Sequence, residues 1–126
     1  MSGRNHRDIF AKDVDWGSAR DGMISYATFV MDPDDSHAPH VLISKFAPGT
    51  RIPPHTHGSN YFEYVMAGGQ MVGKQHYGVG DVRLVKAGTG YGPIVVDAEG
   101  LTALIVFQDG SGSMTQWLPD KGALAG

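Results

Sequence analysis

A chain of 126 residues has room for one domain, and its 41% hydrophobic and 18% charged residues exclude a disordered chain. Its 10 basic and 13 acidic residues give a net charge of -3, so we expect neither nucleic acid nor a membrane as a partner. Without cysteine, disulfides and thiolate metal sites are excluded. The N-terminus lacks the apolar core of a signal peptide, and we expect a cytoplasmic protein.

Turn-forming residues are unusually frequent. The 18 glycines and 7 prolines are 25 of 126 residues, about 20%, against a usual share of roughly 12%. No segment keeps a helical period of apolar residues. This composition favours an all-β sandwich or barrel of short strands joined by tight turns over a helical bundle.

The pattern along the chain predicts a polar lead-in and turn over residues 1–22, one β-barrel over residues 23–120 and a C-terminal tail over residues 121–126. Gly68-Gly69 reads as a hairpin turn, and the two prolines after Arg51 indicate an edge or bulged strand. The predicted strands are Met23–Met31, His40–Phe46, Arg51–His57, Tyr61–Met66, Gln70–Tyr77, Val82–Val85, Ile94–Val96, Leu101–Gln108 and Met114–Leu118.

The most informative segment contains His55 and His57, two residues apart on a predicted strand. Side chains at i and i+2 of a strand point to the same face, so the two imidazoles should lie side by side. Such a pair is one half of a metal site. A pair of this kind also occurs by chance as a solvated pair on an edge strand.

The surroundings of these histidines resemble the first motif of the cupin superfamily. Gly49, His55 and His57 have its types and spacing, and Tyr64–Gly68 matches the strand and turn that end it. Gly80-Asp81 and Gly88 open the second motif in the same way. The resemblance covers roughly residues 41 to 107. It implies an all-β, single-domain cupin barrel of the RmlC-like type, a double-stranded β-helix or jelly roll, with a metal pocket inside.

The sequence departs from the cupin pattern at three positions. Tyr61 stands where the family has its Glu, Lys86 where it has Pro, and Tyr91 where it has the last His. The third metal ligand would then be Glu63, which shares the strand parity of Tyr61, or His76 on the following strand. For Glu63 and for His76 the alternative is an ordinary surface residue. Tyr61 and Tyr91 would line the substrate pocket or simply pack the barrel.

The resemblance implies a divalent-metal-binding cupin with a small-molecule substrate or ligand. Two His and a third ligand leave coordination positions open for oxygen and substrate, as a non-haem Fe(II) dioxygenase requires. We expect Fe2+ first, with Zn2+, Mn2+ or Ni2+ as alternatives. A non-catalytic small-molecule-binding or sensor cupin and a sugar isomerase or epimerase stay open. The resemblance, and the extra strand Met23–Met31, favour a homodimer.

Overall fold

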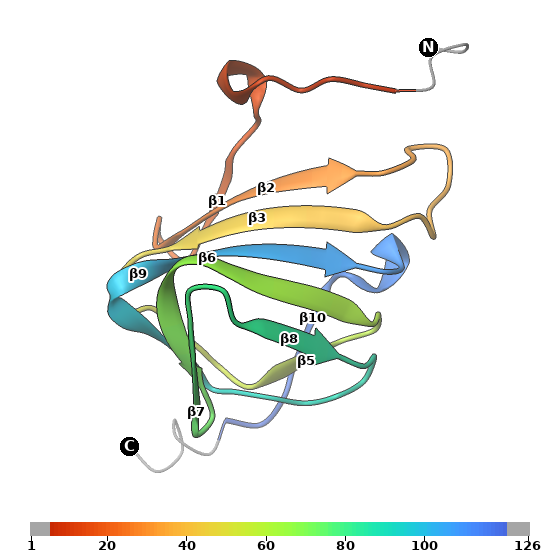
Figure 1. Cartoon of the computed structure of the whole chain (residues 1–126). Coiled ribbons are helices and arrows are strands. Elements are labelled where there is room, and N and C mark those ends of the chain that lie inside the picture. Colours follow the sequence, from red (N-terminus) through yellow and green to blue (C-terminus); the bar gives the residue numbers. More distant parts are fainter. Residues whose placement is uncertain (1–5, 121–126) are drawn as a thin grey trace.

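Ten β-strands and two short 3-10 helices make up the part of the chain that the computed structural model describes, residues 6–120 (Figure 1). The predicted tail, residues 121–126, and the first five residues of the lead-in lie outside this part. The elements are η1 (Ala11–Asp13), β1 (Gly17–Ala19), β2 (Ile24–Val30), β3 (His40–Phe46), β4 (Arg51–Ile52), β5 (His55–His57), β6 (Tyr61–Val72), β7 (Gln75–Gly78), β8 (Val82–Val85), β9 (Ile94–Phe107), η2 (Gly110–Gly112) and β10 (Thr115–Trp117).

All strand pairs are antiparallel, which confirms the all-β prediction. The large sheet has the order β1-β2-β3-β9-β6-β7, with β8 also paired to β6 and β4 to β9. The small sheet pairs β5 with β10. An isolated bridge between His55 and Tyr91 ties the small sheet to the segment that follows β8. The strands therefore enclose a common interior, and β2, β3, β9, β6 and β8 follow one another along one side of it (Figure 1).

Two predicted strand breaks are wrong. β6 continues through Gly68-Gly69 to Val72, and the hairpin turn comes at Gly73-Lys74 instead. Residues 94–107 likewise form one strand, β9. The glycines act as bulges and not as turns, because register shifts between Val65 and Ala67 and between Gly68 and Gln70 absorb them within the β6–β9 pairing.

The bend of β6 and β9 depends on two glycines. Gly68 (φ +70°) and Gly100 (φ +80°) both have left-handed backbone conformations. A Cβ at Gly68 would overlap the carbonyl of Gly100, so the two backbones approach more closely than any other residue type permits. The paired strands can therefore bend together at this point and curl the sheet around its interior.

The interior has an apolar half and a polar half. Val65, Val96, Leu101 and Ala103 form the apolar core, and Phe46, Tyr77 and Ile105 pack against it. Along the first half of β6, Tyr61, Glu63 and Val65 are buried whereas Tyr64 is exposed, so the predicted shared inward parity of Tyr61 and Glu63 is confirmed. Within the described residues, no helix is long and apolar enough to cross a membrane.

The close approach at Gly68 can be tested by comparing two glycine substitutions. Gly80 also has a left-handed backbone (φ +88°) but nothing lies near its missing Cβ. We expect Gly80→Ala to lower the free energy of unfolding by about 1 kcal/mol through backbone strain alone. Gly68→Ala adds a backbone overlap and should cost about 3 kcal/mol or more. Urea denaturation measures the free energy of unfolding of both variants. Equal losses in the two variants would contradict the close backbone approach at Gly68.

Candidate functional site

The two motif histidines lie side by side in the barrel interior. His55 and His57 are both buried on β5, and their ring centroids are 5.2 Å apart with the ring planes perpendicular. β5 is held in place by β10, whose Trp117 is opposite His55 in the register. The two imidazoles therefore occupy one face of a short buried strand, as their spacing predicts.

Backbone carbonyls fix the tautomer of each imidazole. Nδ1 of His55 lies 2.8 Å from the carbonyl oxygen of Pro53, and Nδ1 of His57 lies 3.0 Å from that of Ser113. A carbonyl oxygen only accepts hydrogen bonds, so Nδ1 must carry the proton in both rings. Each Nε2 then has a free lone pair, and no hydrogen bond reaches either Nε2 from the residues that the structure describes. Histidines that bind metals are oriented in this way.

The surroundings keep both rings uncharged. Burial lowers the pKa of His55 and of His57 below the ordinary value. The charge of Arg83 lowers both pKa values further, and the imidazole of His55 also lowers that of His57. Neutral imidazole is the form that coordinates metal ions.

Aromatic side chains surround the pair. Tyr91 lies 4.6 Å from His55 and Tyr61 lies 5.4 Å from His57 between ring centroids, and the two tyrosine rings are 6.1 Å apart. Phe107 packs against His57 at 5.0 Å. Burial raises the pKa of both tyrosines, so the phenols remain protonated and can donate hydrogen bonds. The two residues expected to line a pocket thus lie beside the histidines.

A buried ion pair completes the polar half of the interior. Glu63 Oε1 accepts hydrogen bonds from Arg83 Nη1 at 2.8 Å and from Gln70 Nε2 at 2.9 Å. The guanidinium of Arg83 lies 4.5 Å from the ring centroid of Tyr91, and its Nη2 is 3.5 Å from the Tyr61 hydroxyl. Burial lowers the pKa of Arg83, but the charge of Glu63, its hydrogen bond and the two nearby tyrosines together outweigh burial, so the net shift of this pKa is upward.

The sequence interpretation did not include Arg83 or Gln70. Arg83 stands between Val82 and Leu84 on β8, and alternation along the strand places it inward while its apolar neighbours face outward. This inversion of the usual pattern is visible in the sequence. The partner of Arg83 is not, because Glu63 meets Arg83 only through the register of β6 with β8.

The two candidates for a third metal ligand have partners of their own. Glu63 is engaged by Arg83, and His76 lies on β7 with its Nε2 2.7 Å from Asp97. Among the residues the structure describes, no three His, Cys, Asp or Glu side chains lie close enough to hold one ion. The structure therefore brings together His55 and His57 but not a third such donor.

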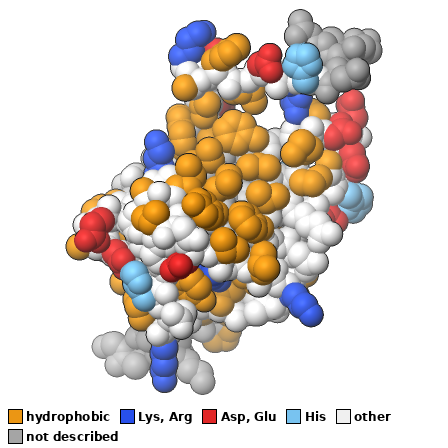
Figure 2. Space-filling view, in the orientation of Figure 1, with side chains coloured by type: hydrophobic (Ala, Val, Ile, Leu, Met, Phe, Trp, Pro, Cys, Tyr) orange, Lys and Arg blue, Asp and Glu red, His pale blue; other side chains and the backbone are white. Residues whose placement is uncertain are grey.

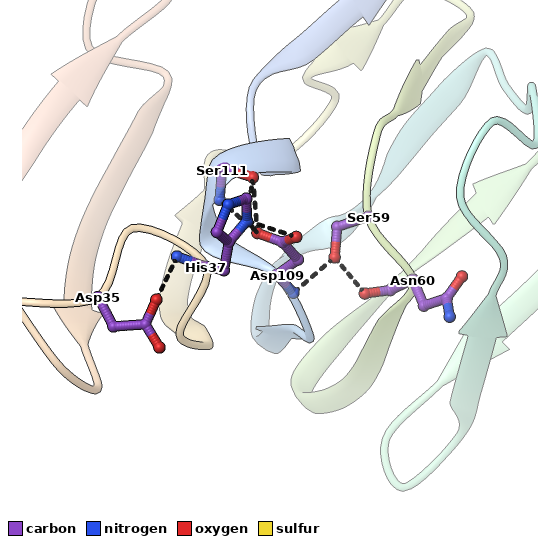
Figure 3. Close-up of polar contacts among 6 residues, drawn as sticks. All are labelled: Asp35, His37, Ser59, Asn60, Asp109 and Ser111. Carbon is purple, nitrogen blue, oxygen red and sulfur yellow. Dashed lines mark hydrogen bonds and ion pairs between the residues drawn. The ribbon is translucent and has the colours of Figure 1, made fainter.

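A second polar cluster has the composition of a catalytic triad but not its geometry (Figure 3). Nδ1 of His37 lies 3.1 Å from Asp109 and 3.3 Å from the Ser111 hydroxyl. That hydroxyl donates to Asp109 at 2.6 Å, so it points at the carboxylate and not at a base. His37 is exposed, and nothing in this arrangement activates the serine as a nucleophile.

This cluster instead supports the loop that orients His57. Asp109 accepts a hydrogen bond from the Ser111 N–H and caps η2, and its own N–H donates to the Ser59 hydroxyl (Figure 3). η2 leads directly to Ser113, whose carbonyl orients His57. The cap therefore fixes the loop on which the orientation of His57 depends.

Several solved structures share this fold. An oxalate decarboxylase from Bacillus subtilis superposes with a TM-score of 0.70 at 22% identity, over 90% of this chain and 34% of its own. An RmlC-like cupin protein from Ralstonia eutropha gives 0.72 at 16% identity, over 93% and 74%. The polyketide cyclase RemF from Streptomyces resistomycificus gives 0.72 at 15% identity, over 90% and 86%.

These superpositions establish that the chain has the cupin fold, as the sequence motifs indicated. The chain spans about a third of the length of the oxalate decarboxylase that it matches. Neither a protein-family model nor a curated protein matches the sequence. At this level of identity the likeness defines the fold and leaves the activity to be argued from the site itself.

The Glu63–Arg83 pair makes a prediction about stability. Arg83→Met leaves a buried carboxylate without its counter-charge, and we expect a loss of about 3–5 kcal/mol in the free energy of unfolding. The double change Glu63→Gln/Arg83→Met removes both charges and should recover much of that loss. Arg51→Met, which breaks an exposed pair with Asp120, is the control and should change the denaturation midpoint little. If the double variant lost the sum of the two single losses in the free energy of unfolding, the coupling between Glu63 and Arg83 would be contradicted.

Proposed function

We propose that this protein is a metal-binding cupin for a small molecule, with a divalent ion held by Nε2 of His55 and of His57. The observation that carries the proposal is the state of these two rings. Both are buried and neutral, both have Nδ1 anchored to a carbonyl, and both keep an Nε2 lone pair that no described residue uses. Two imidazoles with unused lone pairs, whose ring centroids lie 5.2 Å apart, fit a shared cation better than they fit packing alone.

The donor set narrows the chemistry that the ion would supply. Two imidazoles suit Fe2+, Zn2+, Mn2+ and Ni2+, and with few protein ligands several coordination positions stay open to water, oxygen or substrate. With Fe2+ bound, the open positions are those needed for dioxygenase chemistry, which is the activity we favour. The protein's own residues would orient the substrate and exclude water from it.

Charge balance in the interior favours an anionic ligand. Glu63 already balances Arg83, so a divalent ion adjacent to them would leave excess positive charge. The hydroxyls of Tyr61 and Tyr91 and the remaining N–H groups of Arg83 are donors of hydrogen bonds to an oxygen anion. We therefore propose a small molecule with a carboxylate or enolate oxygen as the ligand.

One observation favours a second function, that of a non-catalytic binding or sensor module. The described residues offer no third acidic or histidine donor beside His55 and His57, and aromatic rings pack closely around them. A sensor needs only to bind its ligand. Metal-loaded protein that binds small carboxylates but consumes neither oxygen nor ligand would support this alternative over the dioxygenase.

The metal centre can be tested by removing both imidazoles. His55→Ala/His57→Ala should abolish stoichiometric metal because it removes both unused lone pairs. Elemental analysis after purification without chelator measures the content and identifies the metal, and circular dichroism checks the fold. His6→Ala, which changes an exposed histidine outside the Asp109 cluster, should retain the metal. If the first double variant keeps one ion per chain, the proposal is wrong.

A second test concerns the third ligand. Glu63→Gln should weaken metal binding by about 10-fold or more, because it removes a negative charge that acts on His55, whether or not the carboxylate coordinates the ion. His76→Ala should leave the affinity unchanged, since His76 is exposed and bonded to Asp97. Titration with Zn2+ followed by calorimetry compares the two. A loss confined to His76→Ala would move the third ligand to β7.

A further inference from the structure

The strand that pairs with the histidine strand is exposed along its whole length. Within the described residues β10 pairs with β5 alone, and its residues are all exposed whereas those of β5 are all buried. Trp117 is directly opposite His55 in this pairing, and the two ring centroids lie 5.6 Å apart. Directly paired residues point to the same face of a sheet, so Trp117 shares the inward face of His55.

Trp117 marks an open edge of the interior. His55 is 5% exposed, whereas Trp117 on the same face is 58% exposed. An inward-facing indole is exposed to this extent where the wall beside it ends, and in the described part of the chain β10 has no strand on its other side. Solvent therefore reaches the inward face of the small sheet at the β10 edge, next to His55.

An arginine side chain lies at this edge. The guanidinium carbon of Arg20 is 5.4 Å from the centroid of the Trp117 ring, within the range of a cation–π contact. The step from guanidinium to indole and the step from indole to imidazole together place Arg20 no further from His55 than their sum. Burial is the main cause of the lowered pKa of His55, and the charges of Arg83 and Arg20 lower this pKa further. The charge of Arg20 therefore acts on the site.

The backbone of Arg20 has an unfavourable conformation. Arg20 (φ +51°) and Asp21 (φ +55°), in the loop between β1 and β2, are the two described residues other than glycine with a left-handed backbone. Glycine and asparagine adopt this conformation more readily than arginine does. Arginine at this position therefore costs stability. Strained residues of this kind cluster at sites that hold a ligand, which points to a role for the side chain.

The hydrogen-bond donors of Arg20 are available to a ligand. Arg51 and Arg83 pair with carboxylates, but no carboxylate of the described residues forms an ion pair with Arg20, whose printed contact is the indole alone. On the face that Figure 2 shows, the Lys and Arg side chains stand singly and do not gather into a basic patch that would compete for an anion. The planar guanidinium of Arg20 can bind a carboxylate through two parallel hydrogen bonds.

We propose that Arg20 is a specificity-determining residue at the entrance to the site and that the ligand carries two oxygen anions. One anion would meet the metal ion, the tyrosine hydroxyls and Arg83, and Arg20 would bind the second at the β10 edge. This inference rests on the metal site proposed above, and it narrows the ligand to a small dianion such as a dicarboxylate. The residue that selects the ligand then comes from the loop between β1 and β2, outside the cupin-like motifs.

Calorimetry on the Zn2+-loaded protein tests this assignment. Succinate is compared with butyrate and glutarate with pentanoate, because the acids of each pair have equal chain lengths and differ in the second carboxylate. The unmodified protein should bind at least one dicarboxylate about 10-fold more tightly than the matching monocarboxylate, as a charge-assisted hydrogen bond allows. Arg20→Asn should reduce this preference to about 2-fold or less and change the affinity for the monocarboxylate little. A loss of structure would instead weaken the binding of both acids.

Controls separate the possible failures. Asparagine suits the left-handed backbone, so Arg20→Asn should unfold at the same urea concentration as the unmodified protein or at a higher one. Lys12→Gln removes an exposed cation that pairs with Asp13, and it should keep the dicarboxylate preference. An unmodified protein that takes up no Zn2+ would refute the proposed metal site and this inference with it. Zn2+ uptake with equal affinities within both pairs of acids, or with a preference that survives in Arg20→Asn, would overturn the role of Arg20 and leave the metal site standing.

Discussion

The close approach of Gly68 to Gly100 is the constraint on which the rest of the structure depends. It allows β6 and β9, which share the longest pairing in the sheet, to bend together at two register shifts, between Val65 and Ala67 and between Gly68 and Gln70. With this bend, the first half of β6 turns Tyr61 and Glu63 toward the interior into which β5 directs His55 and His57.

The interior that results is polar where the ligand chemistry is expected and apolar elsewhere. The charges of Glu63 and Arg83 balance each other. The buried surroundings of the histidines therefore carry no large net charge. Burial then keeps the imidazoles neutral and the phenols protonated, which provides lone pairs for a cation and donors for an anion in one place. The same burial that stabilises the barrel thus prepares its site.

The two faces of the sheet have separate roles because strand side chains alternate. Arg83 and Leu84 are neighbours on β8, yet one belongs to the buried ion pair and the other to the exposed apolar face. A one-residue slip of β8 would exchange them, bury an apolar side chain in the polar interior and expose the charge. The Glu63–Arg83 pair therefore also fixes the register that turns Val82 and Leu84 outward.

The sequence by itself determined the all-β class, the cupin resemblance, most strand positions and the shared face of His55 and His57, because alternation, turn residues and motif spacing are local properties. Only the tertiary structure decided that Gly68-Gly69 lies within a strand, since the glycine is required by the distant Gly100. It alone paired Glu63 with Arg83 and His76 with Asp97. Those partners depend on register and sheet closure, which bring residues together across about twenty positions of sequence.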